Sequence, residues 1–370
     1  MAKTQLSALE IHYLLKELGI LLNSKLDKIY HPKKKEIILQ LHVPNKGKHT
    51  LTISPTAIFL AKTKPFIGEP SDLCMYLRKK LKNARLRSIS QPDFERIVSF
   101  NFENKQGRFN LLVEMFSTGN IILLKDNKIL TAAEYQNWSN RTIKPREEYI
   151  YPAKEHNFLE IKKPELKKLL SSTKKDSLVK SLAIDLSLGG TYAEELCILS
   201  GIEKSKKPSE LEEKDISSLF ENIKKIRTKK LSPKTVIQKD KTVDITPFKL
   251  KYYSDLKQKK ADSFNKALDD YFSKKKTSEK KAVQEKKLDR IKNIIQSQKD
   301  TIKKLESDIK ENKAKADKIY ENYQLIDSLL KELKQISKKH SWKDIQKKLK
   351  DHKLIKQVNP KDKTIVVELR

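Results

Sequence analysis

The fold is decided by residues 85–132, RLRSISQPDFERIVSFNFENKQGRFNLLVEMFSTGNIILLKDNKILTA, where short apolar and β-branched runs alternate with turn residues. Runs of this length, bounded by Gly, Asn and Asp, are typical of β-strands. The stretch predicts five strands: Arg85–Ser90, Ile97–Phe102, Phe109–Met115, Asn120–Lys125 and Lys128–Ala132. Strands at this spacing favour a curved mixed or antiparallel sheet, or a two-sheet sandwich, over parallel βαβ units.

The sequence before this stretch continues the same pattern and adds helices. A first helix is predicted over residues 6–18, because its leucines and Ile11 recur at helical spacing, and a second over Ser71–Lys82. Between them lie four further predicted strands: Lys25–Tyr30, Glu36–His42, Thr50–Ile53 and Ala57–Leu60. Residues 1–172 are therefore predicted to form an N-terminal α+β domain.

Residues 173–260 have a different character, because strand signals fade and helical ones replace them. The segment LVKSLAIDLSLGGTYAEELCILSGI reads as two short helices joined at Gly189–Gly190, and a further helix follows near Asp215–Lys225. Helix–glycine turn–helix units bring backbone close to phosphate, and a helix N-terminus attracts anions. The two glycines are therefore candidate backbone contacts to phosphate. The alternative is an ordinary helix cap and turn.

Residues 288–337 carry a heptad pattern. Positions taken three and four apart from Leu288 to Ser337 are apolar in twelve of fifteen cases, with Gln298 and Asn312 among the exceptions. One helix of this length spans about 75 Å and needs a partner to cover its apolar seam. We expect residues 261–352 to form one strand of a coiled-coil arm. Residues 353–370 then begin a β segment that includes Thr364–Leu369.

The charge of the chain points to a polyanionic partner. The 370 residues include 80 Lys and Arg against 48 Asp and Glu, a formal charge of +32. Nucleic acid is the first partner class that such a charge suggests, and an anionic membrane surface is the second. The excess is shared mainly between residues 1–170 and residues 251–350, which favours an extended footprint on a large RNA over one short site.

Composition and motifs exclude several other classes. There is no apolar run of about 18 residues and the N-terminus does not fit a secretory signal, so we expect a cytoplasmic protein that does not span a membrane. Cys74 and Cys197 cannot supply a disulfide framework or a zinc site. P-loop, dinucleotide and HExxH motifs are missing. The sequence therefore predicts no catalytic residue, no cofactor and no metal ion.

Two constellations are candidate contacts to RNA. The window RKKLKNARLR, residues 78–87, has six cations and no acid, and its phosphate-facing candidates are Arg78, Lys79, Lys82, Arg85 and Arg87. The alternative is a solvated face that keeps the protein soluble. The second constellation is Glu95–Arg96, in which the Arg can bind a phosphate or base edge while the acid orients it. The alternative there is a surface ion pair worth about 1 kcal/mol or less.

Several stretches together resemble the NFACT family, which includes RqcH and NEMF and is also known as fibronectin-binding protein A N-terminal-like. The resemblance extends over essentially the whole chain, in the family's order. It rests on SALEIHYLLKELGILLNSKLDKIYHPKKKEIILQL, CMYLRKKLKNARLRSISQPDFERIVSFNF, VEMFSTGNIILL, LSLGGTYAEELCILSGI, VDITPFKLKYYSD and FNKALDDYFSKK. The family implies an N-terminal domain similar to formamidopyrimidine-DNA glycosylase, then a helix-hairpin-helix region and a coiled coil.

The resemblance also implies a function and site residues. Family members bind large ribosomal subunits that carry a stalled nascent chain on tRNA, hold tRNA there, and often promote template-free C-terminal tailing, which uses the ribosome's own peptidyl-transfer chemistry. The family's acid–Arg pair falls on Glu95–Arg96 and its first-helix acid on Glu10; both acids are usually Asp. A further motif places Glu114, Gly119 and Asn120 at matching positions.

The family usually continues past Thr364–Leu369 into a returning helix and a further RNA-binding domain, whereas this sequence stops at Arg370. The resemblance thus implies that the partner helix belongs to a missing C-terminal region or to another chain. Two alternatives differ in class. A DNA glycosylase is disfavoured because the chain begins Met1–Ala2–Lys3, without the proline nucleophile, and lacks a four-cysteine zinc finger. The second alternative is a fibronectin-binding adhesin. Binding to acidic matrix proteins would then be a by-product of the positive charge.

Overall fold

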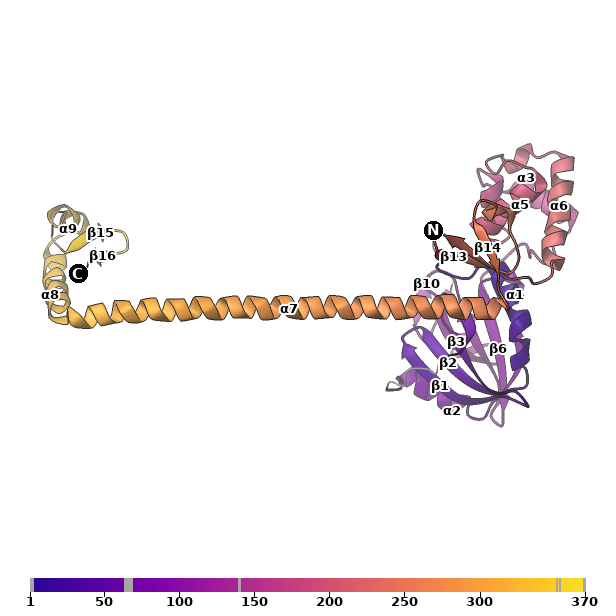
Figure 1. Cartoon of the computed structure of the whole chain (residues 1–370), viewed down its shortest axis with the longest axis horizontal. Coiled ribbons are helices and arrows are strands. Elements are labelled where there is room, and N and C mark those ends of the chain that lie inside the picture. Colours follow the sequence, from indigo (N-terminus) through magenta and orange to yellow (C-terminus); the bar gives the residue numbers. More distant parts are fainter. Residues whose placement is uncertain (1–2, 63–68, 139–140, 351, 353, 369–370) are drawn as a thin grey trace. The chain divides into compact units, whose positions relative to one another are not determined.

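The chain divides into two compact units, Met1–Ser278 and Glu279–Arg370. The computed structural model describes residues 3–62, 69–138, 141–350, 352 and 354–368, with the side chains of residues 276–284 left out. The first unit holds a large sheet, a helical region and a small sheet, and the second holds helices and a short hairpin (Figure 1). The domain boundaries expected from the sequence stay predictions.

A nine-stranded sheet, in the order β4-β3-β2-β1-β5-β6-β7-β8-β9, forms most of the first unit (Figure 1). All its pairings are antiparallel, which agrees with the predicted mixed or antiparallel sheet and excludes the mixed alternative. The strands are β1 Lys25–Lys33, β2 Glu36–Val43, β3 Gly47–Ile53, β4 Ile58–Ala61, β5 Arg85–Ser90, β6 Ile97–Asn104, β7 Gly107–Glu114, β8 Asn120–Lys125 and β9 Lys128–Ala132.

The two halves of this sheet curl around one core. β1 and β5 are joined through a single residue pair, Lys25 with Arg85. Leu39 from one half and Leu111 from the other are fully buried in the same apolar cluster. Successive side chains of a strand point to opposite faces of the sheet, so one face packs into this core and the other faces a second layer or solvent. The observed sheet therefore agrees with the curved arrangement predicted from the sequence.

Helix α1, Ala8–Leu18, lies between two apolar cores. It begins with a capping box in which Ser7 and Glu10 satisfy each other's backbone N–H groups. One face contributes Ile11 and its neighbours to the core of the large sheet, while Leu9 and its neighbours pack into the core of the helical region. α2, Asp72–Lys80, covers the sheet near β1 and starts at the cap of Ser71.

The helical region contains the hairpin expected from the sequence. α4, Leu178–Ile184, and α5, Gly190–Ser200, meet at the Gly189–Gly190 turn, and α6, Glu213–Thr228, packs against α5. α3, Lys163–Ser172, was not predicted; its first turn contains a proline, and it packs on α6. The tertiary contacts of Leu166 and Leu169 stabilise a helix whose remaining face is charged.

A three-stranded sheet contradicts the expectation that strands fade after residue 172. Its order is β13-β12-β14, with β12 Lys234–Gln238, β13 Lys241–Thr246 and β14 Lys257–Lys260. Sequence pattern misses β14 because KQKK has no apolar residue, and the strand exists through its pairing with β12. A smaller hairpin joins β10 Gln136–Trp138 to β11 Arg141–Ile143.

Helix α7, Phe264–Glu321, begins in the first unit and continues into the second. Its start is fixed because Glu17 accepts hydrogen bonds from the backbone N–H groups of Phe264 and Asn265 at 2.9 and 2.7 Å. Asn265 in turn exchanges hydrogen bonds with the backbone of Leu60. The first turns of α7 are thereby attached to the large sheet.

The seam expected over residues 288–337 is helical but interrupted. α7 ends at Glu321, Asn322 leaves helical geometry with φ −106° and ψ 21°, and α8 follows over Tyr323–Lys339. α9, Trp342–Lys348, and the hairpin of β15 Ile355–Asn359 with β16 Thr364–Val367 complete the second unit. The predicted strand at the end is confirmed up to Val367, and Leu369 lies outside the described residues.

No helix in the described part of the chain combines enough length with enough apolar character to cross a membrane.

Candidate nucleic-acid interface

A pocket of about 790 Å³ gathers several of the candidate residues in the first unit. Its wall comes from the N-terminal segment and α1, from the Gly189–Gly190 turn, from β13, and from a short 3₁₀-helix at Lys251–Tyr253. Lys3 N–H donates to the carbonyl of Val243 at 2.7 Å, which ties the N-terminal segment to β13. Glu10 and the glycine turn, 179 positions apart along the chain, thus line one cavity.

The floor of this pocket is a buried ionic cluster. Lys3 Nζ lies 2.7 Å from Glu10 Oε1 and 2.6 Å from Asp244 Oδ1. Tyr192 donates to Glu10 Oε1 at 2.9 Å, and Tyr253 donates to Asp244 Oδ2 at 2.7 Å. The backbone N–H groups of Ser7 and Ile245 engage the same two carboxylates. Each carboxylate oxygen in the cluster therefore has a partner, as buried charges require.

Burial governs the pKa values of this cluster. Burial alone would lower the pKa of Lys3, but the carboxylates of Glu10 and Asp244 raise it, so the ammonium stays charged. Burial raises the pKa of Glu10, against the opposing effect of Lys3. Burial and the neighbouring carboxylates also raise the pKa values of the Tyr192 and Tyr253 hydroxyls. Both tyrosines are consequently donors at neutral pH.

The Gly189–Gly190 turn presents backbone to the pocket. Gly189 has φ +73° and ψ 165°, a region that only glycine adopts readily. No side chain caps the N-terminus of α5, and nothing lies within 4 Å of the positions that Cβ atoms on the two glycines would take. The N–H groups at the start of α5 are thus available to an anion, and the helix dipole favours one there.

Tyr252 and Tyr253 complete the lining of this pocket. Glu195 of α5 accepts hydrogen bonds from the backbone N–H groups of Lys251 and Tyr252 at 3.0 and 2.7 Å, which fixes the 3₁₀-helix that carries them. The rings of Tyr252 and Tyr253 meet edge to face at 4.8 Å, and Tyr252 is 38% exposed. An exposed aromatic side chain in the same pocket as a turn with uncapped backbone N–H groups is an arrangement suited to an unpaired base.

Glu95–Arg96 lies against the other side of the same turn. Ser187, two residues before Gly189, donates to Glu95 Oε1 at 2.8 Å. Lys154 Nζ binds the same oxygen at 3.0 Å. Gln91 links the carbonyls of Ala8 and Glu95, so the loop also packs on the start of α1. The structure therefore brings Glu10, Glu95–Arg96 and Gly189–Gly190 together around residues 187–190.

Glu95 binds Ser187 and Lys154, and no hydrogen bond joins it to the Arg96 side chain among the described residues. Across the described residues, the Arg96 guanidinium makes no hydrogen bond or ion pair, although it is half-buried. Burial lowers the pKa of Arg96 and Glu95 opposes that effect. Just before the pair, Asp93 and Phe94 adopt positive φ values of 48° and 56°, a strained backbone of the kind found at functional sites. The guanidinium is thus partly buried, with donors that no described residue engages.

The cations of residues 78–87 differ in their contacts: the arginines bind other protein groups, and two of the lysines are exposed. Arg78 donates from Nε and Nη2 to the carbonyl of Ile29, at 3.0 and 2.7 Å, which joins α2 to β1. Arg87 pairs with Glu103 at 2.7 Å, and Arg85 donates to the carbonyl of Asn23. Lys79 and Lys82 are exposed and form no ion pair with a described residue.

Glu114, Gly119 and Asn120 are packed into the structure of the large sheet. Glu114 is buried and holds Arg141 through two hydrogen bonds of 2.8 and 3.2 Å. Asn120 is fully buried and joins its strand to the backbone of Glu134. Gly119 has φ +67°, and a Cβ there would lie 2.2 Å from Cβ of Pro55. These contacts hold β8 and the turn before it in place, so the structure gives all three residues a structural role.

Sequence reasoning missed Lys3, Tyr192, Asp244 and Tyr253, which line the pocket, and Lys154 and Ser187, which bind Glu95. Their partners lie far apart along the chain, as with Lys3 and Asp244 at 241 positions. No local spacing signals such a cluster. A grouping of three or more His, Cys, Asp or Glu side chains suited to a metal ion does not occur among the described residues.

The chain is similar to a protein family and to several known proteins. Residues 7–366 match the family described as NFACT N-terminal and middle domains. The chain is 33% identical to the archaeal Rqc2 homolog aRqcH of Methanocaldococcus jannaschii, covering 100% of this chain and 58% of that protein. It is 26% identical to the human ribosome quality control complex subunit NEMF, covering 93% of this chain and 35% of that protein.

The fold is shared with a solved bacterial structure. The N-terminal part of the fibronectin/fibrinogen-binding protein of Streptococcus suis superposes with a TM-score of 0.57 at 23% identity, covering 73% of this chain and all of that one. This likeness shows the α+β fold. The similarity to formamidopyrimidine-DNA glycosylases stays a prediction. Because the family match extends over nearly the whole sequence, the chain belongs to the NFACT family.

Proposed function

We propose that this protein is a ribosome quality control factor that binds obstructed large ribosomal subunits and the tRNA they carry. Two relatives, aRqcH and NEMF, have names that refer to this system, and the chain spans 58% and 35% of their lengths. The observation that carries the proposal is that the Gly189–Gly190 turn and Tyr252 line one pocket, while Ser187, just before this turn, binds Glu95, the neighbour of Arg96. A free guanidinium, uncapped backbone N–H groups and an exposed ring suit a bent RNA strand.

Each group has a distinct part in the proposed contact. Arg96 supplies a planar donor set that binds a phosphate through two hydrogen bonds. The N–H groups that begin α5 bind a neighbouring phosphate, and Tyr252 stacks on a base. Glu10 acts indirectly, because its carboxylate is engaged by Lys3 and Tyr192 and positions α1 beside the turn.

The site supports binding more than catalysis by this protein. The four carboxylate oxygens of Glu10 and Asp244 are all engaged, so neither acid is placed to exchange a proton with a substrate. Tailing of stalled chains, if this protein promotes it, then uses the peptidyl-transfer chemistry of the ribosome. The protein's part is to hold tRNA in position.

The remaining candidate surfaces extend the contact. Lys79 and Lys82 are proposed to contact rRNA phosphates, with Arg85 and Arg87 as weaker contributors because they also bind protein groups. The seam of α7 exposes Leu288, Ile302 and Ile309, each more than half exposed. We propose that a returning helix, from a C-terminal region or another chain, covers this seam in a cytoplasmic complex.

The test is co-sedimentation with purified large subunits that carry peptidyl-tRNA. Arg96→Ala removes the free guanidinium, and we expect at least a tenfold loss of binding; Arg96→Lys retains the charge without the planar fork and should fall between. Lys128→Ala removes one exposed charge from β9 and serves as the control. If Arg96→Ala and wild-type protein sediment equally at low and moderate salt, the proposal is wrong.

A further inference from the structure

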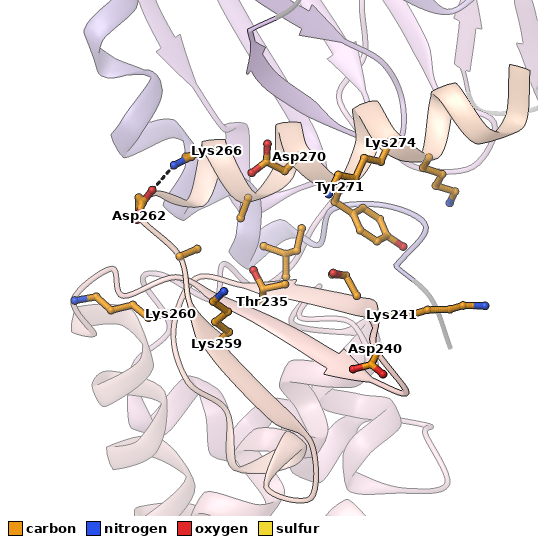
Figure 2. Close-up of a pocket in the computed structure, with 15 residues that line it drawn as sticks. Thr235, Asp240, Lys241, Lys259, Lys260, Asp262, Lys266, Asp270, Tyr271 and Lys274 are labelled. Carbon is orange, nitrogen blue, oxygen red and sulfur yellow. Dashed lines mark hydrogen bonds and ion pairs between the residues drawn. The ribbon is translucent and has the colours of Figure 1, made fainter. Parts of the chain in front are cut away.

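A second groove, of about 870 Å³, lies between the three-stranded sheet and the first turns of α7 (Figure 2). Its floor includes Thr235 and Lys259, and its roof is the helix face that carries Lys266, Asp270 and Lys274. These three positions are four residues apart, so they share one side of α7. The two hydrogen bonds that Glu17 accepts from Phe264 and Asn265 hold the start of this helix, which keeps the groove preformed.

Lysines from three elements converge on this groove. Lys241 comes from β13, Lys259 and Lys260 from β14, and Lys274 from α7; all four are exposed (Figure 2). None of them forms an ion pair with another described residue. Asp262, which also lines the groove, forms its ion pair with Lys266. The groove is lined by six lysines against Asp240, Asp262 and Asp270, so it keeps a net charge of 6 − 3 = +3.

One pairing in the sheet shows that this charge works against stability. Lys234 of β12 and Lys260 of β14 are direct cross-strand partners, and like charges in that relation are destabilising. Lysines on an edge strand also prevent pairing with a strand of another molecule, and this role is enough to explain the lysines of β14. It does not explain Lys241 and Lys274, which lie on other elements and border the same groove.

The lining distinguishes between kinds of anionic partner. Tyr271 is the aromatic side chain among the described residues of the groove, and its hydroxyl donates to the carbonyl of Lys3 at 3.0 Å. Unpaired strands are bound through stacked bases, whereas a duplex is recognised through its backbone. We propose that the lysine groove, defined by Lys241, Lys259, Lys260 and Lys274, binds the phosphate backbone of double-stranded RNA. Binding by the isolated protein tests this apart from any role on the ribosome.

The experiment measures fluorescence anisotropy of a labelled RNA duplex of about 16 base pairs, and of its single strand, with the full chain in a salt series. The test variant is Lys259→Gln/Lys260→Gln/Lys274→Gln. The control, Lys46→Gln/Lys128→Gln/Lys144→Gln, removes three exposed lysines of the large-sheet domain that lie outside both proposed sites. We expect the test variant to bind the duplex roughly tenfold more weakly, with a salt slope lower by about 2 to 3.

The same samples supply two further readings. Lysine acetylation, followed by mass spectrometry, should show that the duplex protects the groove lysines of the wild-type chain and leaves Lys46, Lys128 and Lys144 reactive. Equal duplex affinity and slope for both triple variants would overturn the proposal. An equal loss for the single strand would overturn the duplex assignment. Loss of binding to phosphatidylserine vesicles with unchanged RNA binding would assign the groove to a membrane instead. Unchanged thermal unfolding confirms that the variants are folded.

Discussion

Ser187 donates a hydrogen bond of 2.8 Å to Glu95 although the two residues lie 92 positions apart. Ser187 belongs to the turn that leads into α5, and Glu95 to the strained loop before β6. Lys154 Nζ binds the same Glu95 oxygen at 3.0 Å, so Glu95 has two partners other than Arg96. One hydroxyl thus couples the helical region to the candidate Arg.

Removing that hydroxyl should loosen the site without unfolding the protein. We expect Ser187→Ala to lower the free energy of unfolding by about 1 kcal/mol, because Glu95 loses one of its two partners. Binding of tRNA should weaken severalfold in a filter-binding assay. Ser171→Ala is the matched control, since its hydroxyl bonds only to the carbonyl of Lys168 at an exposed position. Equal behaviour of the two variants would contradict the coupling.

Lys3 should be essential to the pocket because it neutralises two buried acids. Replacing one partner of a buried ionic group typically costs about 3 to 5 kcal/mol, so Lys3→Met should lower the urea midpoint strongly. The triple variant Lys3→Met/Glu10→Gln/Asp244→Asn removes the uncompensated charges and should recover part of the loss. The comparison is made by urea unfolding at pH 7. A triple variant no more stable than Lys3→Met would show that the charges are not the cause.

Gly119 should tolerate no side chain. An alanine there combines φ +67° with a Cβ placed 2.2 Å from Cβ of Pro55, so the turn before β8 must move. We expect Gly119→Ala to cost about 2 to 4 kcal/mol in the free energy of unfolding. Gly19→Ala provides the contrast: its φ of −52° is helical and its Cβ meets nothing within 4 Å. That substitution should be neutral or stabilise by about 0.5 kcal/mol.

His12 should make the protein less stable in mild acid. Burial lowers its pKa to about 4 from the usual 6.5, and Lys16 adds to the effect. The neutral ring therefore contributes its full stability above pH 6.5, and this contribution is lost as the pH falls toward 4. With allowance for partial exposure, the loss is about 1 to 2 kcal/mol.

Urea unfolding of wild-type protein and His12→Gln at pH 7 and at pH 4.5 measures this difference. The variant should lose less stability than wild-type protein between the two pH values. His12 packs edge to face on Tyr13 at 5.4 Å and tilted on Phe94 at 6.5 Å, so the substitution also carries a pH-independent loss. Parallel loss in both proteins would show that other groups govern the acid response.

Much of the architecture was accessible from the sequence because it depends on local pattern. Residues 85–132 alternate in a way that fixes the strands β5–β9, and the glycines at 189 and 190 mark the start of α5. β14 escaped prediction because KQKK has no apolar residue and the strand exists through its pairing with β12. The break at Asn322 escaped as well, since the apolar repeat runs through it unchanged.

The sequence by itself determined the antiparallel sheet, the helical hairpin, the apolar repeat and the positive charge, because each follows from residue type and spacing along the chain. The tertiary structure alone decided what the candidate residues do. It engaged Arg78 with the carbonyl of Ile29 and buried Glu114 against Arg141, while it left the Arg96 guanidinium without a hydrogen bond or ion pair to any described residue. Whether a charge meets solvent, a partner or a ligand depends on groups that folding brings together from other parts of the chain.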